Sequence, residues 1–222
     1  MSTFWDTVFG TKLPTVYYCE EAQDAIIARP GYFVSNFAYI FIGVYLLAQR
    51  DKFAKILGIL SIAVGFFSGM YDASFRFNAQ ILDLMGMFGL VIFLLMYNFY
   101  KLKLIRKLYA LITGMLLLLG YLVSIIVIEG QSGRWLFGVS LVLIIITEYL
   151  LYKRQVIGYY KYFVIALVMV LIGFMIWSFD ALEILCSPIK YLNGRAIFHC
   201  ITAVSILYLY LHKRENIAEK EN

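Results

Sequence analysis

The stretch FFSGMYDASFRFNAQILDL, Phe66 to Leu84, decides the fold because it sets polar side chains between long apolar segments. Ser68, Asp72 and Asp83 each lie where the flanking residues are hydrophobic enough to cross a membrane. An ionisable group at that depth costs about 2.5–3.5 kcal/mol on insertion scales, so such groups face a protein interior and mark function. The stretch therefore predicts a buried polar site between two membrane helices.

A second polar set lies near the end of the chain, in NGRAIFHCITAV from Asn193 to Val204. It places Arg195 and His199 four residues apart, which is one face of a helix. Apolar segments again lie on both sides. We expect the rest of the chain to be a frame that holds the two sets together.

The composition is that of an integral membrane protein. The 222 residues are 63% hydrophobic and only 15% charged, with a mean hydropathy of +0.82, whereas soluble domains carry about 25% charged residues. The net charge of +5 does not indicate nucleic-acid binding, because the basic residues lie in short loops, where membrane topology explains them. Met1–Thr15 lacks a basic segment followed by an apolar one, so no cleavable signal peptide is expected.

The chain contains seven apolar segments after residue 30, each near the ~20 residues that a bilayer requires. The sequence predicts an all-α membrane protein, a seven-transmembrane-helix bundle. Residues 1–30 are expected to form an outer N-terminal segment, 31–211 the transmembrane domain and 212–222 a cytoplasmic tail. The predicted spans are Gly31–Gln49, Phe53–Phe75, Ala79–Tyr100, Leu104–Ile128, Trp135–Tyr152, Tyr160–Phe179 and Gly194–Leu211.

The basic residues predict the orientation. Of the 19 Lys and Arg, 13 fall on one side of the predicted spans, and the positive-inside rule makes that side cytoplasmic. The N-terminus is then outside and the C-terminus cytoplasmic, as an odd number of spans requires. We expect a multi-pass protein of the plasma membrane in a bacterium, or of an endomembrane in a eukaryote. The 13 are Arg50, Lys52, Lys55, Lys101, Lys103, Arg106, Lys107, Lys153, Arg154, Lys161, Lys213, Arg214 and Lys220.

This topology brings the unusual polar residues to one leaflet, the outer one. Spacing leaves two interpretations open. Asp72 and His199 can contribute to a metal site, with Asp83 orienting a water molecule. Alternatively, Asp72 and Arg195 form an ion pair, in a direct hydrogen-bonded contact, with Asp83 and His199 alongside and Ser68 one turn deeper.

The opposite end carries one further acidic residue within a span. Glu148 lies near the cytoplasmic end of the fifth span, and we interpret it as an interfacial ion pair with Lys153 or Arg154. No Gly-rich phosphate loop, CxxC pair or GxSxG elbow is present, and the seventh span has no interior Lys for a retinal Schiff base.

Four features together resemble the alkaline ceramidase family, part of a wider group of seven-helix membrane hydrolases that includes the adiponectin-type receptors. They span nearly the whole chain and occur in the family's order. Each is recognised by its spacing: Cys19-Glu20 followed by Pro30 and Ser35-Asn36; Ser68-x3-Asp72-x10-Asp83; Trp177-x2-Asp180 followed by Cys186; and Arg195-x3-His199.

The resemblance implies an intramembrane zinc amidase. In the family, three His bind zinc, which activates a water molecule for attack on a lipid amide such as ceramide. It implies catalytic roles for Ser68, Asp83 and His199, and a calcium ion that is held by acidic residues of the N-terminal loop and braces the site. It also implies a disulfide between Cys19 and Cys186, with Cys200 left free.

The chain departs from the family at its metal positions. Asp72, Arg195 and His199 stand at the three zinc positions, so that His199 alone keeps the family's ligand. A guanidinium has no free acceptor and stays charged, so Arg195 cannot bind a metal. In the calcium loop Glu20 matches, but Arg29 falls near an expected acidic ligand. We therefore expect no cofactor, with zinc at His199 as the alternative, and no calcium.

Three functions follow. The first is a ceramidase-like membrane protein that is zinc-free and binds a ceramide-like membrane lipid without hydrolysing it. The second is an active hydrolase of linear lipid amide C–N bonds, using a non-standard metal site or Asp83 and His199 as acid–base groups. The third, a transporter or proton relay, is the most remote. The lipid functions predict an apolar cavity that reaches the outer polar cluster.

Overall fold

The structure is a computed structural model that describes residues 3–127, 132–154, 160–184, 186 and 193–218. This part of the chain is helical and contains no strand. Its helices are α1 (Thr3–Phe9), α2 (Pro30–Ser35), α3 (Phe37–Leu47), α4 (Lys52–Ser74), α5 (Phe77–Lys101), α6 (Lys107–Val127), α7 (Ser132–Lys153), α8 (Lys161–Ala181) and α9 (Gly194–Ala218).

Seven helical segments are long and apolar enough to span a membrane, which confirms the predicted seven-span architecture. Two features differ from the expectation. The N-terminal segment contains a helix, α1, and α9 continues to Ala218 instead of ending near Leu211. The first span consists of α2 and α3, which meet at Asn36 without a break in direction.

The turn between α4 and α5 explains why the opening stretch forms one site. Helix α4 begins at Asp51, whose carboxylate caps the helix by accepting a hydrogen bond from the Ala54 amide at 2.8 Å. It ends at Phe75, in the left-handed conformation with φ of 50°. Because α5 begins two residues later, at Phe77, the chain reverses sharply and brings Asp72 and Asp83 to the same end of the bundle.

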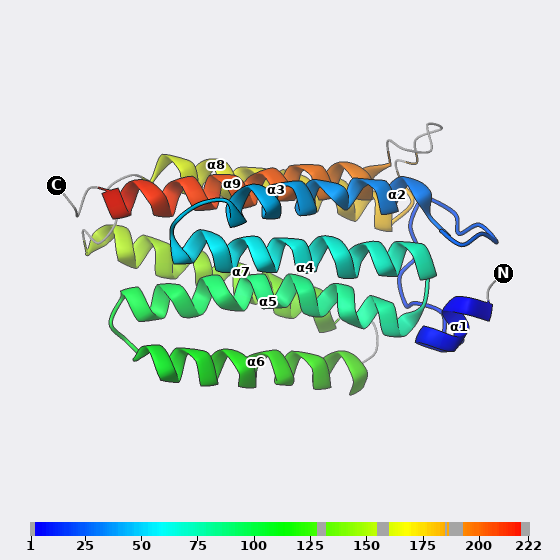
Figure 1. Cartoon of the computed structure of the whole chain (residues 1–222), viewed down its shortest axis with the longest axis horizontal. Coiled ribbons are helices and arrows are strands. Elements are labelled where there is room, and N and C mark those ends of the chain that lie inside the picture. Colours follow the sequence, from blue (N-terminus) through cyan, green and yellow to red (C-terminus); the bar gives the residue numbers. More distant parts are fainter. Residues whose placement is uncertain (1–2, 128–131, 155–159, 185, 187–192, 219–222) are drawn as a thin grey trace.

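The helices run along the long axis of the molecule, and the two termini lie at opposite ends (Figure 1). Helix α8 packs along α9 and α3 along α4, while α6 lies at the edge of the bundle and packs on α5 (Figure 1). Glycines allow α3 and α4 to approach closely: a Cβ on Gly65 would lie 2.8 Å from the Asn36 carbonyl oxygen.

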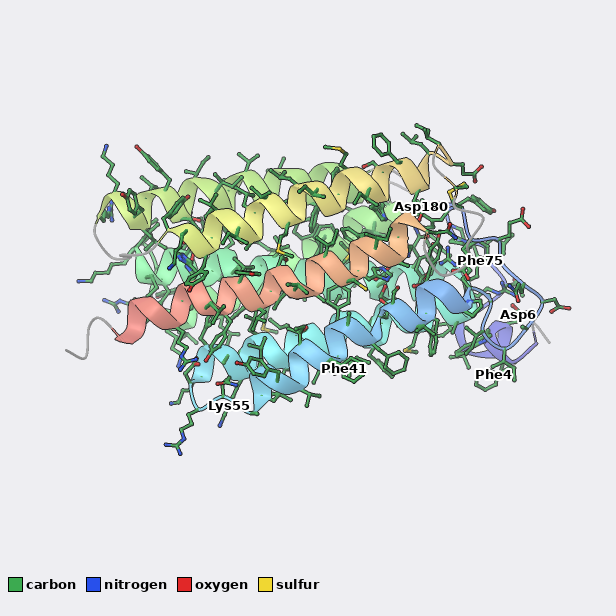
Figure 2. The ribbon with its side chains drawn as sticks, turned by 90° about the horizontal axis from the view of Figure 1, so that it is seen from above. Phe4, Asp6, Phe41, Lys55, Phe75 and Asp180 are labelled. Atoms are coloured by element: carbon green, nitrogen blue, oxygen red, sulfur yellow. A yellow bond between two sulfur atoms is a disulfide. The ribbon has the colours of Figure 1, made fainter. Side chains whose placement is uncertain are left out.

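Side chains labelled in Figure 2 mark the two ends of this axis. Asp6, Phe75 and Asp180 lie at the end that carries α1, and Lys55 lies at the other (Figure 2). We propose that the end that carries Lys55 faces the cytoplasm, because the positive-inside rule places Lys and Arg on that side. The end that carries α1 then faces outward.

The close approach at Gly65 gives a test of the helix packing. Gly65→Ala places a methyl group against the Asn36 backbone and should lower the free energy of unfolding by about 1–3 kcal/mol. Gly120→Ala is the matched control, because a Cβ there meets no atom within 4 Å and Ala is the better helix former by roughly 0.5–1 kcal/mol. Denaturation in detergent micelles measures both. Equal effects would contradict the packing.

Candidate functional site

Four buried charged residues meet at the α1 end of the bundle: Arg29, Asp72, Asp83 and Arg195, called here the arginine cluster. Arg195 donates from Nη2 to Asp83 Oδ2 at 3.0 Å and to Ser68 Oγ at 3.4 Å. It also donates from Nη1 to the Tyr18 hydroxyl at 2.9 Å. Helices α4, α5 and α9 therefore supply the side chains that the sequence analysis grouped together.

Asp72 is held differently from the prediction. Its Oδ1 accepts a hydrogen bond from Arg29 Nη2 at 2.8 Å, and its Oδ2 accepts one from Asn36 Nδ2 at 2.9 Å. Arg195 Nε lies 3.4 Å from Asp72 Oδ1, within ion-pair distance but without a hydrogen bond. The expected Asp72–Arg195 ion pair is therefore present. The direct hydrogen bond expected between them is wrong, because Arg29 bonds to Asp72 and Arg195 bonds to Asp83 instead.

The ion pair of Arg29 with Asp72 is the feature of the site that sequence reasoning missed. Arg29 is fully buried, with 0% of its surface exposed, and its guanidinium lies 4.6–5.4 Å from four aromatic rings. Those rings stabilise a cation through their negative faces; they belong to Tyr18, Tyr32, Tyr71 and Phe75. One sequence signal was available, since Asp72 and Asp83 give two buried acids against the single cation Arg195.

The N-terminal loop is ordered by acidic residues that bind backbone groups. Glu20 accepts hydrogen bonds from the amides of Gly31 and Tyr32, both at 2.8 Å, at the start of α2. Burial raises the pKa of the Glu20 carboxyl above its ordinary value, although these two amides act in the opposite direction. Asp180 accepts from the Cys19 amide at 2.9 Å and from the Tyr32 hydroxyl at 3.0 Å. Glu20 therefore fixes the N-terminal loop to the start of α2, and Asp180 fixes the same loop to α8.

The predicted disulfide between Cys19 and Cys186 is present, with an S–S distance of 2.08 Å and a Cα–Cα distance of 5.2 Å. It ties the N-terminal loop to the segment between α8 and α9. Cys200, on α9, is free and exposed, as expected.

His199 stands beside the cluster and is held by α2. Its Nδ1 lies 2.8 Å from Ser35 Oγ, and that hydroxyl donates its own hydrogen to the Tyr32 carbonyl at 2.7 Å. In the tautomer that keeps both of these contacts, Nδ1 carries the proton and donates it to Ser35. Nε2 is then the acceptor nitrogen, and His199 lines the cavity described next.

A cavity runs from the arginine cluster into the apolar interior, as predicted. Its polar end is lined by Ser68, Asp83, Arg195 and His199. Its deeper part is lined almost wholly by apolar side chains of α5, α7, α8 and α9. The two parts adjoin each other, because six residues line both: Tyr39, Val64, Met87, Phe137, Phe174 and Phe198.

The residues present do not fit zinc. Both Asp72 oxygens already accept hydrogen bonds from cationic or amide donors, and the Arg195 guanidinium has no lone pair to offer. Of the side chains at the three family zinc positions, His199 alone has an atom suited to bind the metal, its Nε2. Within the described ranges, no group of three His, Cys, Asp or Glu side chains is placed to hold a metal ion.

A second buried polar cluster lies at the other end of the bundle and comprises Asn98, Glu148, His212 and Lys213; it is called here the basal cluster. Glu148 Oε1 lies 2.5 Å from Lys213 Nζ, and its Oε2 lies 3.1 Å from His212 Nε2. Asn98 bonds to both members of the Glu148–Lys213 pair. The expected interfacial pairing of Glu148 with Lys153 or Arg154 is therefore wrong, because α9 extends far enough to bring its own cation to Glu148.

The arginine cluster predicts a large effect of removing Arg29. Arg29→Met leaves the buried Asp72 carboxylate without its hydrogen-bonded cation and should cost about 3–5 kcal/mol in the free energy of unfolding. Adding Asp72→Asn removes the orphaned charge and should restore much of the loss. Arg76→Met is the control: it breaks the partly exposed Arg76–Asp6 pair and should cost at most about 1 kcal/mol. An Arg29→Met variant as stable as Arg76→Met would contradict this assignment.

Comparison with known proteins agrees with the geometry. A search of curated protein sequences gave no match. A family model described as Ceramidase matches residues 11–218, which is nearly the whole chain and includes both polar clusters and the cavity. The chain therefore belongs to the ceramidase family, as an integral membrane protein of the alkaline ceramidase type.

Proposed function

We propose that this ceramidase-family protein holds a ceramide-like membrane lipid in its cavity without zinc and without hydrolysing it. The observation that carries the proposal is the placement of Arg195, a cation at a family zinc position, between two carboxylates at the head of an apolar cavity. A divalent cation entering there would meet two guanidinium groups in a medium of low dielectric constant, which repel it.

The chemistry of the cavity suits such a lipid. Its polar end offers the acceptor Nε2 of His199, the Ser68 hydroxyl and the Asp83 carboxylate, which match the N–H and O–H donors of a ceramide head group. Its apolar part suits an alkyl chain, whose transfer there costs no hydrogen bond. Two observations favour a calcium-free N-terminal loop: both Glu20 oxygens accept hydrogen bonds from backbone amides, and Arg29 brings a positive charge.

An active hydrolase is the second candidate, and one observation favours it. His199 lines the cavity, so its neutral imidazole can take a proton from a water molecule that attacks the amide carbon and pass it to the amine that leaves. Arg195 Nη2 and Ser68 are then placed to donate to the developing oxyanion. Asp83 would act through its ion pair with Arg195, at 3.0 Å.

Turnover of a purified sample separates the two candidates. The wild-type protein, in detergent with a metal chelator and an excess of ceramide, should retain bound ceramide and release no fatty acid. Mass spectrometry of the organic extract measures both quantities. Fatty-acid release that survives chelation and disappears in His199→Ala would overturn the non-catalytic proposal in favour of metal-free hydrolysis.

Restoring the family ligands should restore metal binding. Asp72→His with Arg195→His recreates three His at the family positions. Arg29 would then lose its partner Asp72 and remain as an unpaired buried cation, so Arg29→Gln is added. The triple variant should bind about one zinc per chain, measured by elemental analysis after dialysis. Adding His199→Ala is the control and should abolish uptake. A folded triple variant that binds no zinc would show that these positions do not converge as proposed.

A further inference from the structure

The basal cluster stands where the apolar cavity ends. The lining of the cavity stops at a similar depth on three helices, and the next helical turn of each carries a member of the cluster. The last lining residues are Leu94 on α5, Ile145 on α7 and Leu209 on α9, and they are followed by Asn98, Glu148 and Lys213 respectively. A fourth helix joins in, since the Phe163 ring of α8 lines the cavity and lies 5.7 Å from the His212 ring.

The cluster is a barrier of a different kind from an apolar wall. An apolar wall yields when side chains change rotamer, and a longer alkyl chain gains contacts as it advances. A methyl group that advances between Glu148 and Lys213 must instead separate atoms 2.5 Å apart and leave two buried charges without partners. Asn98 adds to the barrier because it bonds to both residues.

The distance between the two polar clusters, measured along α9, fits one long alkyl chain of a lipid. His199 at the polar end and His212 at the basal end lie on the same helix, 13 residues apart, which is about 20 Å at 1.5 Å per residue. One leaflet of a bilayer has roughly 15 Å of hydrocarbon, half of the ~30 Å core. A lipid with its head at the arginine cluster therefore has room for one long alkyl chain and then meets the basal cluster.

We propose that the basal cluster is the floor of the ligand cavity and sets the maximum length of the alkyl chain that the protein accepts. The inference rests on the proposed lipid-binding function and adds a limit that the family match does not contain. Glu148 and Lys213 are specificity-determining residues in this account, although they lie far from the head group.

The test compares chain-length profiles in the full-length protein. The probes are ceramides with saturated N-acyl chains that differ by two methylenes, each competing with a fluorescent ceramide for the purified protein in lipid nanodiscs. Wild-type affinity should hold up to a limiting length and fall at least about tenfold beyond it. Glu148→Ala with Lys213→Ala removes both charges together, so no partner is orphaned. The limit should then move by about one helical turn, 5.4 Å, or roughly four methylenes.

Two controls separate chain length from stability. Asp6→Ala with Arg76→Ala removes an ion pair remote from the cavity and should leave the limit unchanged. Ser205→Leu fills the cavity wall above the floor and should shorten the limit, which keeps the proposal testable if the Glu148–Lys213 double variant fails to fold.

The outcomes distinguish the two proposals. If the wild-type protein binds no member of the series, the lipid-binding proposal fails and the floor fails with it. If it binds lipid with no limiting length, the chain leaves the cavity sideways into the bilayer and the floor alone is wrong. A limit that does not move in the Glu148–Lys213 double variant, or in Ser205→Leu where the double variant does not fold, also overturns the floor and leaves lipid binding intact.

Discussion

The structure depends on keeping two arginines and two aspartates together in the interior of a membrane bundle. Alone, each charge would be too costly to bury; together, Arg29, Asp72, Asp83 and Arg195 form a neutral group whose members are separated by 2.8–3.4 Å. The group joins the N-terminal loop to α4, α5 and α9. In the zinc-free protein that we propose, this ion-pair network holds the helices together without a bound ion.

The polar residues divide the cavity into a head and a floor. The arginine cluster and His199 define the end where a head group can form hydrogen bonds. The basal cluster closes the opposite end, and the helices between them carry the apolar lining. A buried ion pair is costly to place in such an interior, so two of them at the two ends of one cavity indicate that the space between them is used.

Much of this was predictable from sequence, and the failures share a cause. Apolar segments of bilayer length predicted the seven spans, and Ser68, Asp72 and Asp83 among them predicted a buried polar site between two helices. Partner choice was not predictable, because a buried charge pairs with whichever opposite charge the tertiary fold brings near. Arg29 reached Asp72 from a loop, and Lys213 reached Glu148 from a helix extended beyond its apolar segment.

The most direct test of the account is the metal content of the wild-type protein. The protein is expressed in zinc-replete medium, purified without chelator and analysed for zinc beside its His199→Ala variant. The account predicts zinc well below one ion per chain in the wild type, with no further loss on substitution. One zinc per chain in the wild type, lost in His199→Ala, would contradict it, since a metal would then occupy the place that Arg195 and Arg29 are assigned.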